Sequence, residues 1–249
     1  MDNDDKPVGK VLSRRQALRL LGVAGGAAGA GLLGERVIAQ NNPNSPTALP
    51  SCVVRPALTE GPYFVDERLN RSDIRTDSKT GTIKAGLPLT LTFLVSTVGV
   101  GKCEPRSGVM VDVWHCDAQG AYSDVSDRSF NTQGQDFLRG YQITDASGKA
   151  TFSTIYPGWY PGRAVHIHFK LRTVQGGSFT GEFTSQLFFD EAVTDAVHAR
   201  APYDTRGRRT TLNQNDSIYR NGGNQMLLSL KGSPTTGYAA TFDVGLNIA

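Results

Sequence analysis

The 249-residue sequence has little of several features that mark specialised proteins. Its three cysteines are too few for a disulfide-built scaffold, and a chain of this length buries enough surface to fold without one. It has no excess of one charge, because 26 Lys and Arg oppose 23 Asp and Glu. A nucleic-acid-binding protein would be much more basic. These absences indicate an ordinary globular domain that binds no nucleic acid.

The first 39 residues have the order of an export signal. Ser13-Arg14-Arg15-Gln16-Ala17-Leu18 is a twin-arginine pattern, and the uncharged stretch Leu20–Gly34 follows it. Val37-Ile38-Ala39 then offers the small residues that a signal peptidase reads. Fifteen uncharged residues, six of them Gly, are too few to span about 30 Å of hydrocarbon. We expect residues 1–39 to be a twin-arginine signal peptide, and the protein to be periplasmic, cell-surface or extracellular.

Composition divides the remaining chain once. Residues 40–50 are polar, rich in Pro and Asn and without periodicity, which predicts a linker. Residues 51–249 show no further shift in composition and no repeat, so we expect one domain. After removal of residues 1–39, 20 basic and 19 acidic residues remain, so the slightly basic character belongs mostly to the leader. We expect no membrane span in the mature protein.

Alternating apolar residues between Gly- and Pro-containing turns predict an all-β fold, a β-sandwich of mostly antiparallel strands with long loops. One helix is expected over 190–200, capped by Asp190. The expected strands are Pro88–Val95, Val109–His115, Gly140–Thr144, Ala150–Ile155, Val165–Leu171, Ser185–Phe189, Leu227–Leu230 and Ala239–Ile248.

Two of the four histidines form the sequence His166-Ile167-His168 within an expected strand. Because side chains alternate along a strand, both imidazoles lie on one face and Ile167 on the other. Two imidazoles on a shared face are half of a metal site. The loop before them, Tyr156–Arg163, places Tyr160 and Arg163 nearby. A phenolate and a guanidinium beside two histidines suit a hard cation and an anionic substrate.

A second segment has the same character, since Trp114 is followed by a turn and then by Gly120-Ala121-Tyr122. Together with Pro157-Gly158-x-Tyr160-Pro161 and Arg163-x-x-His166-x-His168, it resembles the intradiol ring-cleavage dioxygenases. Thr59–Phe64 and Gly86–Leu89 are similar to other motifs of that family. The resemblance covers most of the chain after Cys52.

The resemblance implies a non-haem Fe(III) enzyme that inserts both atoms of O2 into a catechol-type diol and releases a muconate-type diacid. Carried over by position, the metal ligands are Tyr122, Tyr160, His166 and His168. Tyr160 would also leave the metal and accept a proton, Arg163 would stabilise negative charge on the ring, and Gln186 would assist it. The chain has a shorter Tyr160–His166 loop than well-known members and no long dimerising N-terminal helical region. Substrate choice therefore stays open, as does a homo-oligomer.

Two other functions stay open at this point. A cupin-like Fe(II) or zinc enzyme would use His-x-His with a carboxylate, but no acidic residue follows His168 before Glu182. A β-sandwich binding module for aromatic or carbohydrate ligands would use Trp114, Trp159 and the tyrosines as a stacking surface.

The remaining candidates are expected to be structural. His115 has no counterpart among the implied ligands, and His198 is expected at the surface of the helix. Arg206, Arg208 and Arg209 are expected in a solvated loop or near carboxylates. In an exported protein one disulfide is plausible. A strand of about 23 Å separates Cys103 from Cys116, which disfavours that pair and leaves Cys52 with one of the two.

Overall fold

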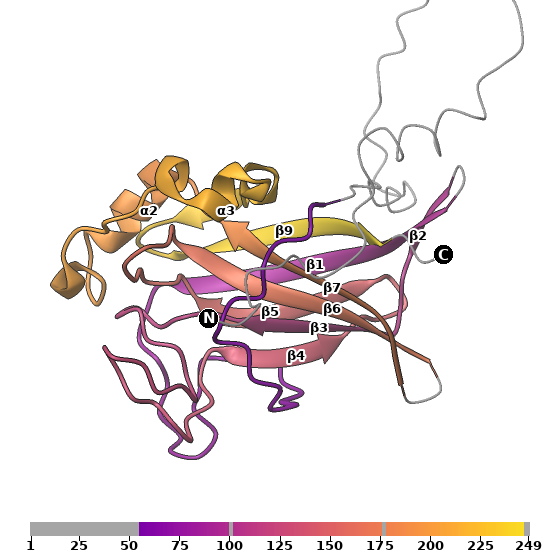
Figure 1. Cartoon of the computed structure of the whole chain (residues 1–249), viewed down its shortest axis with the longest axis horizontal. Helices are drawn as coiled ribbons and strands as arrows, with labels where there is room; N and C mark the ends of the chain where they lie inside the picture. Colours follow the sequence, from indigo (N-terminus) through magenta and orange to yellow (C-terminus); the bar gives the residue numbers. More distant parts are fainter. Residues whose placement is uncertain (1–54, 100–101, 176–177, 247–249) are drawn as a thin grey trace, which may run out of the picture.

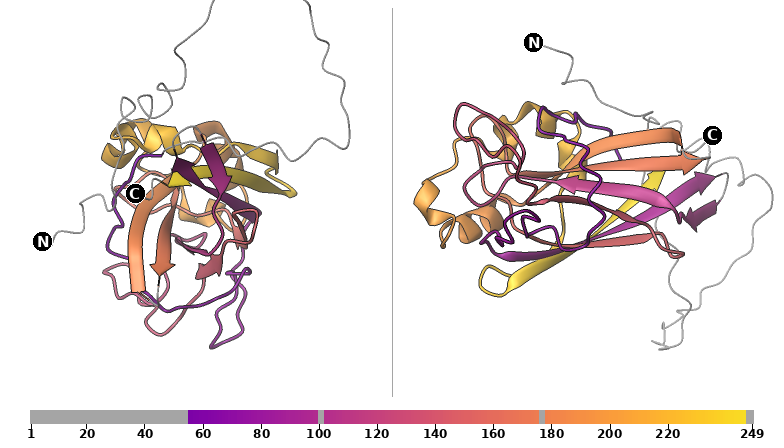
Figure 2. Two further views of the ribbon diagram at one scale, coloured as in Figure 1. Left: turned by 90° about the vertical axis from the view of Figure 1, so that its right-hand side faces the viewer. Right: turned by 90° about the horizontal axis from the view of Figure 1, so that it is seen from below.

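Two β-sheets packed face to face make the scaffold (Figures 1 and 2). The computed structural model describes residues 55–99, 102–175 and 178–246. The expected signal peptide, the linker and Cys52 lie outside these residues. Among the described residues, no helix has the length and apolar character needed to cross a membrane.

The first sheet has β1 at its centre, paired in parallel with β9 on one side and antiparallel with β2 and β5 on the other. In the second sheet, all pairs are antiparallel, in the order β4-β3-β6-β7. The strands are β1 (Pro88–Gly99), β2 (Lys102–Pro105), β3 (Val109–Trp114), β4 (Arg139–Ile143), β5 (Lys149–Ile155), β6 (His166–Gln175), β7 (Ser178–Phe188), β8 (Leu230–Ser233) and β9 (Gly237–Leu246).

Helical segments gather at one end of the sandwich, after β7 (Figure 1). The helix α2 (Glu191–His198) begins at Asp190, whose carboxylate accepts from the backbone N–H groups of Ala192 and Val193, as expected. The other segments are the 3-10 helices η1 (Asp204–Arg206), η2 (Asn213–Asn215) and η3 (Gly223–Met226) and the single turn α3 (Ser217–Arg220).

The core lies between the inner faces of the two sheets. Phe93 of β1 contacts the rings of Phe152, Phe169 and Phe242, which come from three other strands in both sheets. Alternation on β6 directs Ile167, Phe169 and Leu171 into this core. The alternate residues of β6, which include both histidines, therefore lie on the outer face of the four-stranded sheet.

The all-β sandwich with one short helix is confirmed, with two local differences in the strands. Strand β8 begins at Leu230, so the strand expected at Leu227–Leu230 is wrong except for its last residue. Leu227 instead forms an isolated bridge with Phe188. The short strand β2 was not expected, because its Lys-Cys-Glu-Pro sequence has no apolar alternation.

Cys103 is disulfide-bonded and Cys116 is a buried free thiol, so the disfavoured pairing of these two does not occur.

Candidate metal-binding active site

The two histidines stand at the start of β6, an inner strand of the four-stranded sheet, at the end of the sandwich that carries the helical segments (Figure 1). His168 lies directly between Trp114 of β3 and Gln186 of β7 in the strand register. The register is regular from His166 to Thr173 and shifts only beyond Thr173. The pairing that places Gln186 beside the histidines is therefore regular.

Four polar atoms converge at this point. The Nε2 atoms of His166 and His168 are 2.9 Å apart. The Tyr160 hydroxyl lies 3.1 Å from His166 Nε2, and the Tyr122 hydroxyl lies 3.5 Å from the same atom. Tyr122, His166 and His168 are almost fully buried, whereas Tyr160 is partly exposed. Tyr122, Tyr160, His166 and His168, which the sequence singled out, are thus brought together.

Hydrogen bonding fixes which nitrogen of His166 faces the other three groups. Its Nδ1 lies 2.6 Å from the carbonyl oxygen of Ala164, which can only accept a hydrogen bond. Nδ1 therefore carries the proton, and the Nε2 lone pair faces His168 and the tyrosines. A carbonyl partner on one ring nitrogen is the usual way in which proteins orient a metal-binding imidazole.

The loops that carry the two tyrosines pack against each other backbone to backbone. A Cβ atom on Gly120 would lie 2.3 Å from the carbonyl oxygen of Trp159, and one on Gly158 would lie 2.5 Å from that of Asp117. The Gly158 N–H donates to the same Asp117 carbonyl over 3.1 Å. Only glycine permits this close approach, so the Gly residues of both motifs fix the distance between the tyrosine loops.

Burial determines the protonation of the four groups. It raises the pKa of the Tyr122 and Tyr160 phenols and lowers the pKa of both His166 and His168 well below 6.5. The imidazoles are therefore neutral, which is the form that binds a metal. A bound cation favours loss of the phenol protons, because its charge is larger than any other local charge. Two phenolates and two neutral imidazoles make a hard, dianionic donor set.

Arg163 and Gln186 form a linked pair beside this set. Arg163 Nη2 donates to Gln186 Oε1 over 2.5 Å, and Gln186 Nε2 donates to the carbonyl oxygen of Thr59 over 2.7 Å. Gln186 is fully buried, and Arg163 is partly exposed. Asp216, which the sequence interpretation missed, accepts from Arg163 Nε over 2.9 Å. Asp216-Ser217 fits a helix N-cap, but no pattern in the sequence connects it to Arg163.

Aromatic rings enclose the site. Trp114 stacks on His168, with ring centroids 5.0 Å apart and planes inclined by 10°. Tyr63, from the Thr59–Phe64 motif, stacks on Tyr122 with centroids 4.5 Å apart and donates to Asp127 over 3.0 Å. Burial and this carboxylate raise the pKa of Tyr63 to about 12. These rings hold two of the four donor side chains in place.

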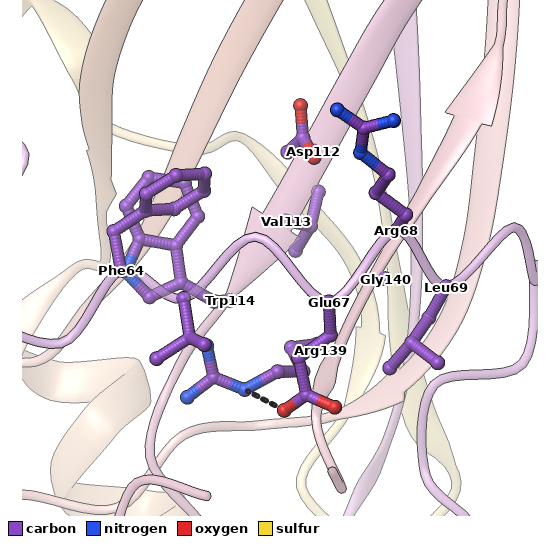
Figure 3. Close-up of a pocket in the computed structure, with 10 residues that line it drawn as sticks. Phe64, Glu67, Arg68, Leu69, Asp112, Val113, Trp114, Arg139 and Gly140 are labelled. Atoms are coloured by element: carbon purple, nitrogen blue, oxygen red, sulfur yellow. Dashed lines mark ion pairs between the residues drawn. The ribbon is translucent and has the colours of Figure 1, made fainter. Parts of the chain in front are cut away.

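A small cavity lies behind this aromatic layer (Figure 3). Phe64, Trp114 and the ion pair between Arg139 and Glu67 line it, as Figure 3 shows. Its volume of about 20 Å³ is room for one water molecule and not for an aromatic ring. A larger cavity of about 320 Å³ lies near Asp190 and Tyr219, and none of the four donor residues lines it.

The other histidines and the arginine loop lie apart from the four donors. His115 is fully buried between the Cys116 carbonyl and the Thr154 hydroxyl, so it is structural, as expected. His198 is not an ordinary surface residue, because it stacks on Tyr203 with centroids 5.2 Å apart. Its Nε2 lies 3.1 Å from the Pro157 carbonyl oxygen. The alanines around His198 predict a helix but do not indicate which side of that helix is packed.

Two of the three arginines of the following loop, Arg208 and Arg209, lie as expected, whereas Arg206 packs on Trp159. Arg209 pairs with Glu191 and Asp195, and Arg208 is exposed. Arg206 donates to the Trp159 carbonyl over 2.8 Å and lies over the Trp159 ring. These residues stabilise the end of the sandwich and form no patch for a polyanion.

Curated relatives of the chain are dioxygenases that act on catechols. The chain is 29% identical over 136 residues to a chlorocatechol 1,2-dioxygenase from Pseudomonas sp. strain P51, covering 47% of the chain and 50% of the relative. It is 34% identical over 94 residues to a protocatechuate 3,4-dioxygenase beta chain from Burkholderia cepacia, covering 34% and 39%. The chain thus spans half or less of the length of these relatives.

Solved structures extend the similarity to 79% of the chain. An intradiol ring-cleavage dioxygenase from Tetranychus urticae superposes with a TM-score of 0.68 at 28% identity, covering 79% of this chain and 95% of that one. The dioxygenase domain of a carbohydrate-binding fusion protein from Streptomyces sp. SirexAA-E gives 0.56 at 29% identity, covering 79% and 100%. The family model described as Dioxygenase matches residues 59–215, which is more than half of the chain. The chain therefore belongs to the intradiol ring-cleavage dioxygenase family.

Proposed function

We propose that the protein is an exported non-haem Fe(III) dioxygenase that cleaves catechol-type diols between the two hydroxylated carbons. The reaction adds both atoms of one O2 to one diol and gives a muconate-type diacid. The observation that carries the proposal is the convergence of two phenol oxygens and two imidazole Nε2 atoms around His166.

The donor set fits ferric iron. Fe(III) is a hard cation and prefers anionic oxygen ligands, whereas softer donor sets favour other metals. Two tyrosinates would offset two of its three charges. His166 presents an unprotonated Nε2, because its other nitrogen is bonded to Ala164. We therefore assign Tyr122, Tyr160, His166 and His168 as the ligands.

The protein side chains take distinct roles in the proposed reaction. Bound Fe(III) would supply a Lewis-acidic centre that lowers the pKa of both diol hydroxyls. Tyr160 is the more exposed tyrosine, and as a tyrosinate its phenolate oxygen would accept a proton from the incoming diol. Tyr122 is buried under Tyr63 and stays in place. Arg163 presents a fixed positive charge that stabilises negative charge on the ring, and Gln186 holds that guanidinium.

The two alternative functions fit the structure less well. In the part of the chain that the structure describes, no group of three or more His, Cys, Asp or Glu side chains can hold a metal, so the cupin-like set has no carboxylate. Trp114 and Trp159 are 1% and 9% exposed, so they form no open stacking surface for an aromatic or sugar ligand.

Visible absorption of the iron-loaded protein tests the proposal. Tyrosinate-to-Fe(III) charge transfer should give a broad visible band that weakens in Tyr160→Phe. Tyr156→Phe is the matched control, because it removes a buried hydroxyl that bonds to Thr194 and lies outside the donor set. Oxygen uptake with catechol, protocatechuate and hydroxyquinol would then identify the substrate. A folded, iron-loaded protein that stays colourless would contradict the proposal.

A further inference from the structure

Asp216 is a buried carboxylate that connects the helical end of the molecule to the site. Its Oδ1 caps α3 by accepting from the N–H groups of Ile218 and Tyr219, over 2.7 and 3.0 Å. Its Oδ2 accepts from Arg163 Nε over 2.9 Å and from the Ala164 N–H over 2.8 Å. One side chain thus joins the start of α3 to Arg163 and Ala164, in the loop that leads into the histidine strand.

The contact with Asp216 leaves Arg163 few ways to move. Nε is held by Asp216, and Nη2 is held by Gln186. Nη1 makes no hydrogen bond to the residues that the structure describes, so it remains available as a donor. A guanidinium is planar, and two anchors on Nε and Nη2 fix the direction of the third nitrogen.

The contact with Ala164 reaches a proposed iron ligand. Asp216 holds the Ala164 N–H, and the carbonyl oxygen of the same residue accepts from His166 Nδ1 over 2.6 Å. The carboxylate therefore fixes the residue that orients the imidazole. Both Arg163 and His166 depend on a side chain that lies one residue beyond the family match, which ends at residue 215.

We propose that Asp216 is a positioning residue that sets the Arg163 guanidinium and, through Ala164, the His166 ring. The inference rests on the proposed function for its effect on catalysis. The printed contacts of the Asp216 side chain are with Arg163, Ala164 and the start of α3, and none is with the four donor atoms, so it acts through Arg163 and Ala164. The helical segment that follows β7 is in this way part of the active-site support.

Asp216→Asn separates this role from helix capping. Asn caps helices as well as Asp does, but it has no charge, and its amide nitrogen cannot accept from Arg163. We expect kcat for the catechol-type diol to fall about 10–100-fold, with a smaller change in KM. Asp190→Asn is the matched control, because Asp190 caps α2 and, among the described residues, contacts no arginine. It should change kcat by no more than about 2-fold.

A second measurement needs no activity. In the iron-free protein, the Arg163 Nε–H should give an exchange-protected NMR signal, assigned by its loss in Arg163→Lys, and Asp216→Asn should abolish the protection. An unchanged signal, or a kcat equal to that of Asp190→Asn, would overturn the inference. If wild-type iron-loaded protein consumes no oxygen with any diol, the proposed function fails, and the NMR result still decides whether Asp216 holds Arg163.

Discussion

Gly61 lies directly against the ring of His168. A Cβ atom at Gly61 would be 3.1 Å from His168 Cε1, and the backbone has a φ of +75°. The N-terminal segment that carries Gly61 is held to β6 by the ion pair between Glu60 and Lys170. The segment therefore closes over a proposed iron ligand at a position where a side chain would press on the ring.

We expect Gly61→Ala to lower both stability and iron content. Positive φ alone costs an L-residue roughly 1–2 kcal/mol, and contact with His168 adds to that cost. Gly134→Ala is the control, because Gly134 has a φ of +80° and a Cβ atom added there would meet nothing within 4 Å. Urea unfolding and iron-to-protein ratios would compare the two variants. Equal losses of iron would show that the His168 contact has no effect.

Gln186→Leu should impair catalysis with little loss of folding. Leucine leaves Arg163 Nη2 and the Thr59 carbonyl without their partner, so we expect kcat to fall about 10–100-fold. Thr184→Val changes the same face of β7, at a buried hydroxyl without a hydrogen bond in the described structure. It should leave kcat unchanged. Steady-state kinetics of both variants would test this, and a normal kcat in Gln186→Leu would contradict it.

His115 should make the iron-free protein less stable in acid. Burial lowers its pKa from 6.5 to about 4. Between these values the unfolded chain binds a proton that the folded chain does not, so stability falls as the pH drops from about 6.5 to about 4. The loss from this residue is about 3 kcal/mol. The difference in unfolding free energy between pH 7 and pH 4 should be smaller in His115→Asn than in the wild-type protein. An identical difference would show that His115 does not cause the loss of stability in acid.

Cys116 should be unreactive in the native protein. Its side chain is 1% exposed, and burial raises the pKa of its thiol, so almost no thiolate is present at neutral pH. Without reductant, iodoacetamide should label no thiol in the folded chain and one thiol in the urea-unfolded chain. Mass spectrometry should place the label on Cys116. Two or three labels would contradict a disulfide at Cys103.

The proposed export should depend on the paired arginines, Arg14 and Arg15. Arg14→Lys combined with Arg15→Lys should retain the full-length protein inside the producing cell, whereas Arg19→Lys should not. Fractionation with antibody detection would measure this. Normal export of the double variant would show that the leader uses another route.

Alternation and turn residues predicted most of the strands because each has one face in the core. Val165–Leu171 is recognisable for that reason, and β6 begins at His166 but runs on to Gln175. The first residues of β7 escaped prediction because Phe179–Glu182 are exposed and have no face in the core. Strand β2 is held by pairing with β1 and has no apolar pattern of its own.

The sequence predicted those candidate site residues that belong to a recognisable motif. It did not predict residues that reach the site only through the fold of the chain. Tyr122, Tyr160, His166 and His168 stand at spacings typical of a family, and the fold brings them together. Asp216 has no such spacing, because it reaches Arg163 only after β7 and α2 have turned the chain back. The expectation that His198 is an ordinary surface residue is wrong for a similar reason. Its ring stacks on Tyr203, and no sequence pattern shows that the chain after α2 brings Tyr203 against it.

The parallel pairing of β1 with β9 has a consequence for how the molecule folds. Thr90 pairs with Ala239, so this central pair joins segments at opposite ends of the domain. Until β9 arrives, one edge of β1 stays open, and open edges are templates for pairing with other chains. Such distant pairings also form slowly. Aggregation during synthesis should therefore depend on how soon β9 reaches β1, and a chaperone that shields this edge would raise the yield of folded protein.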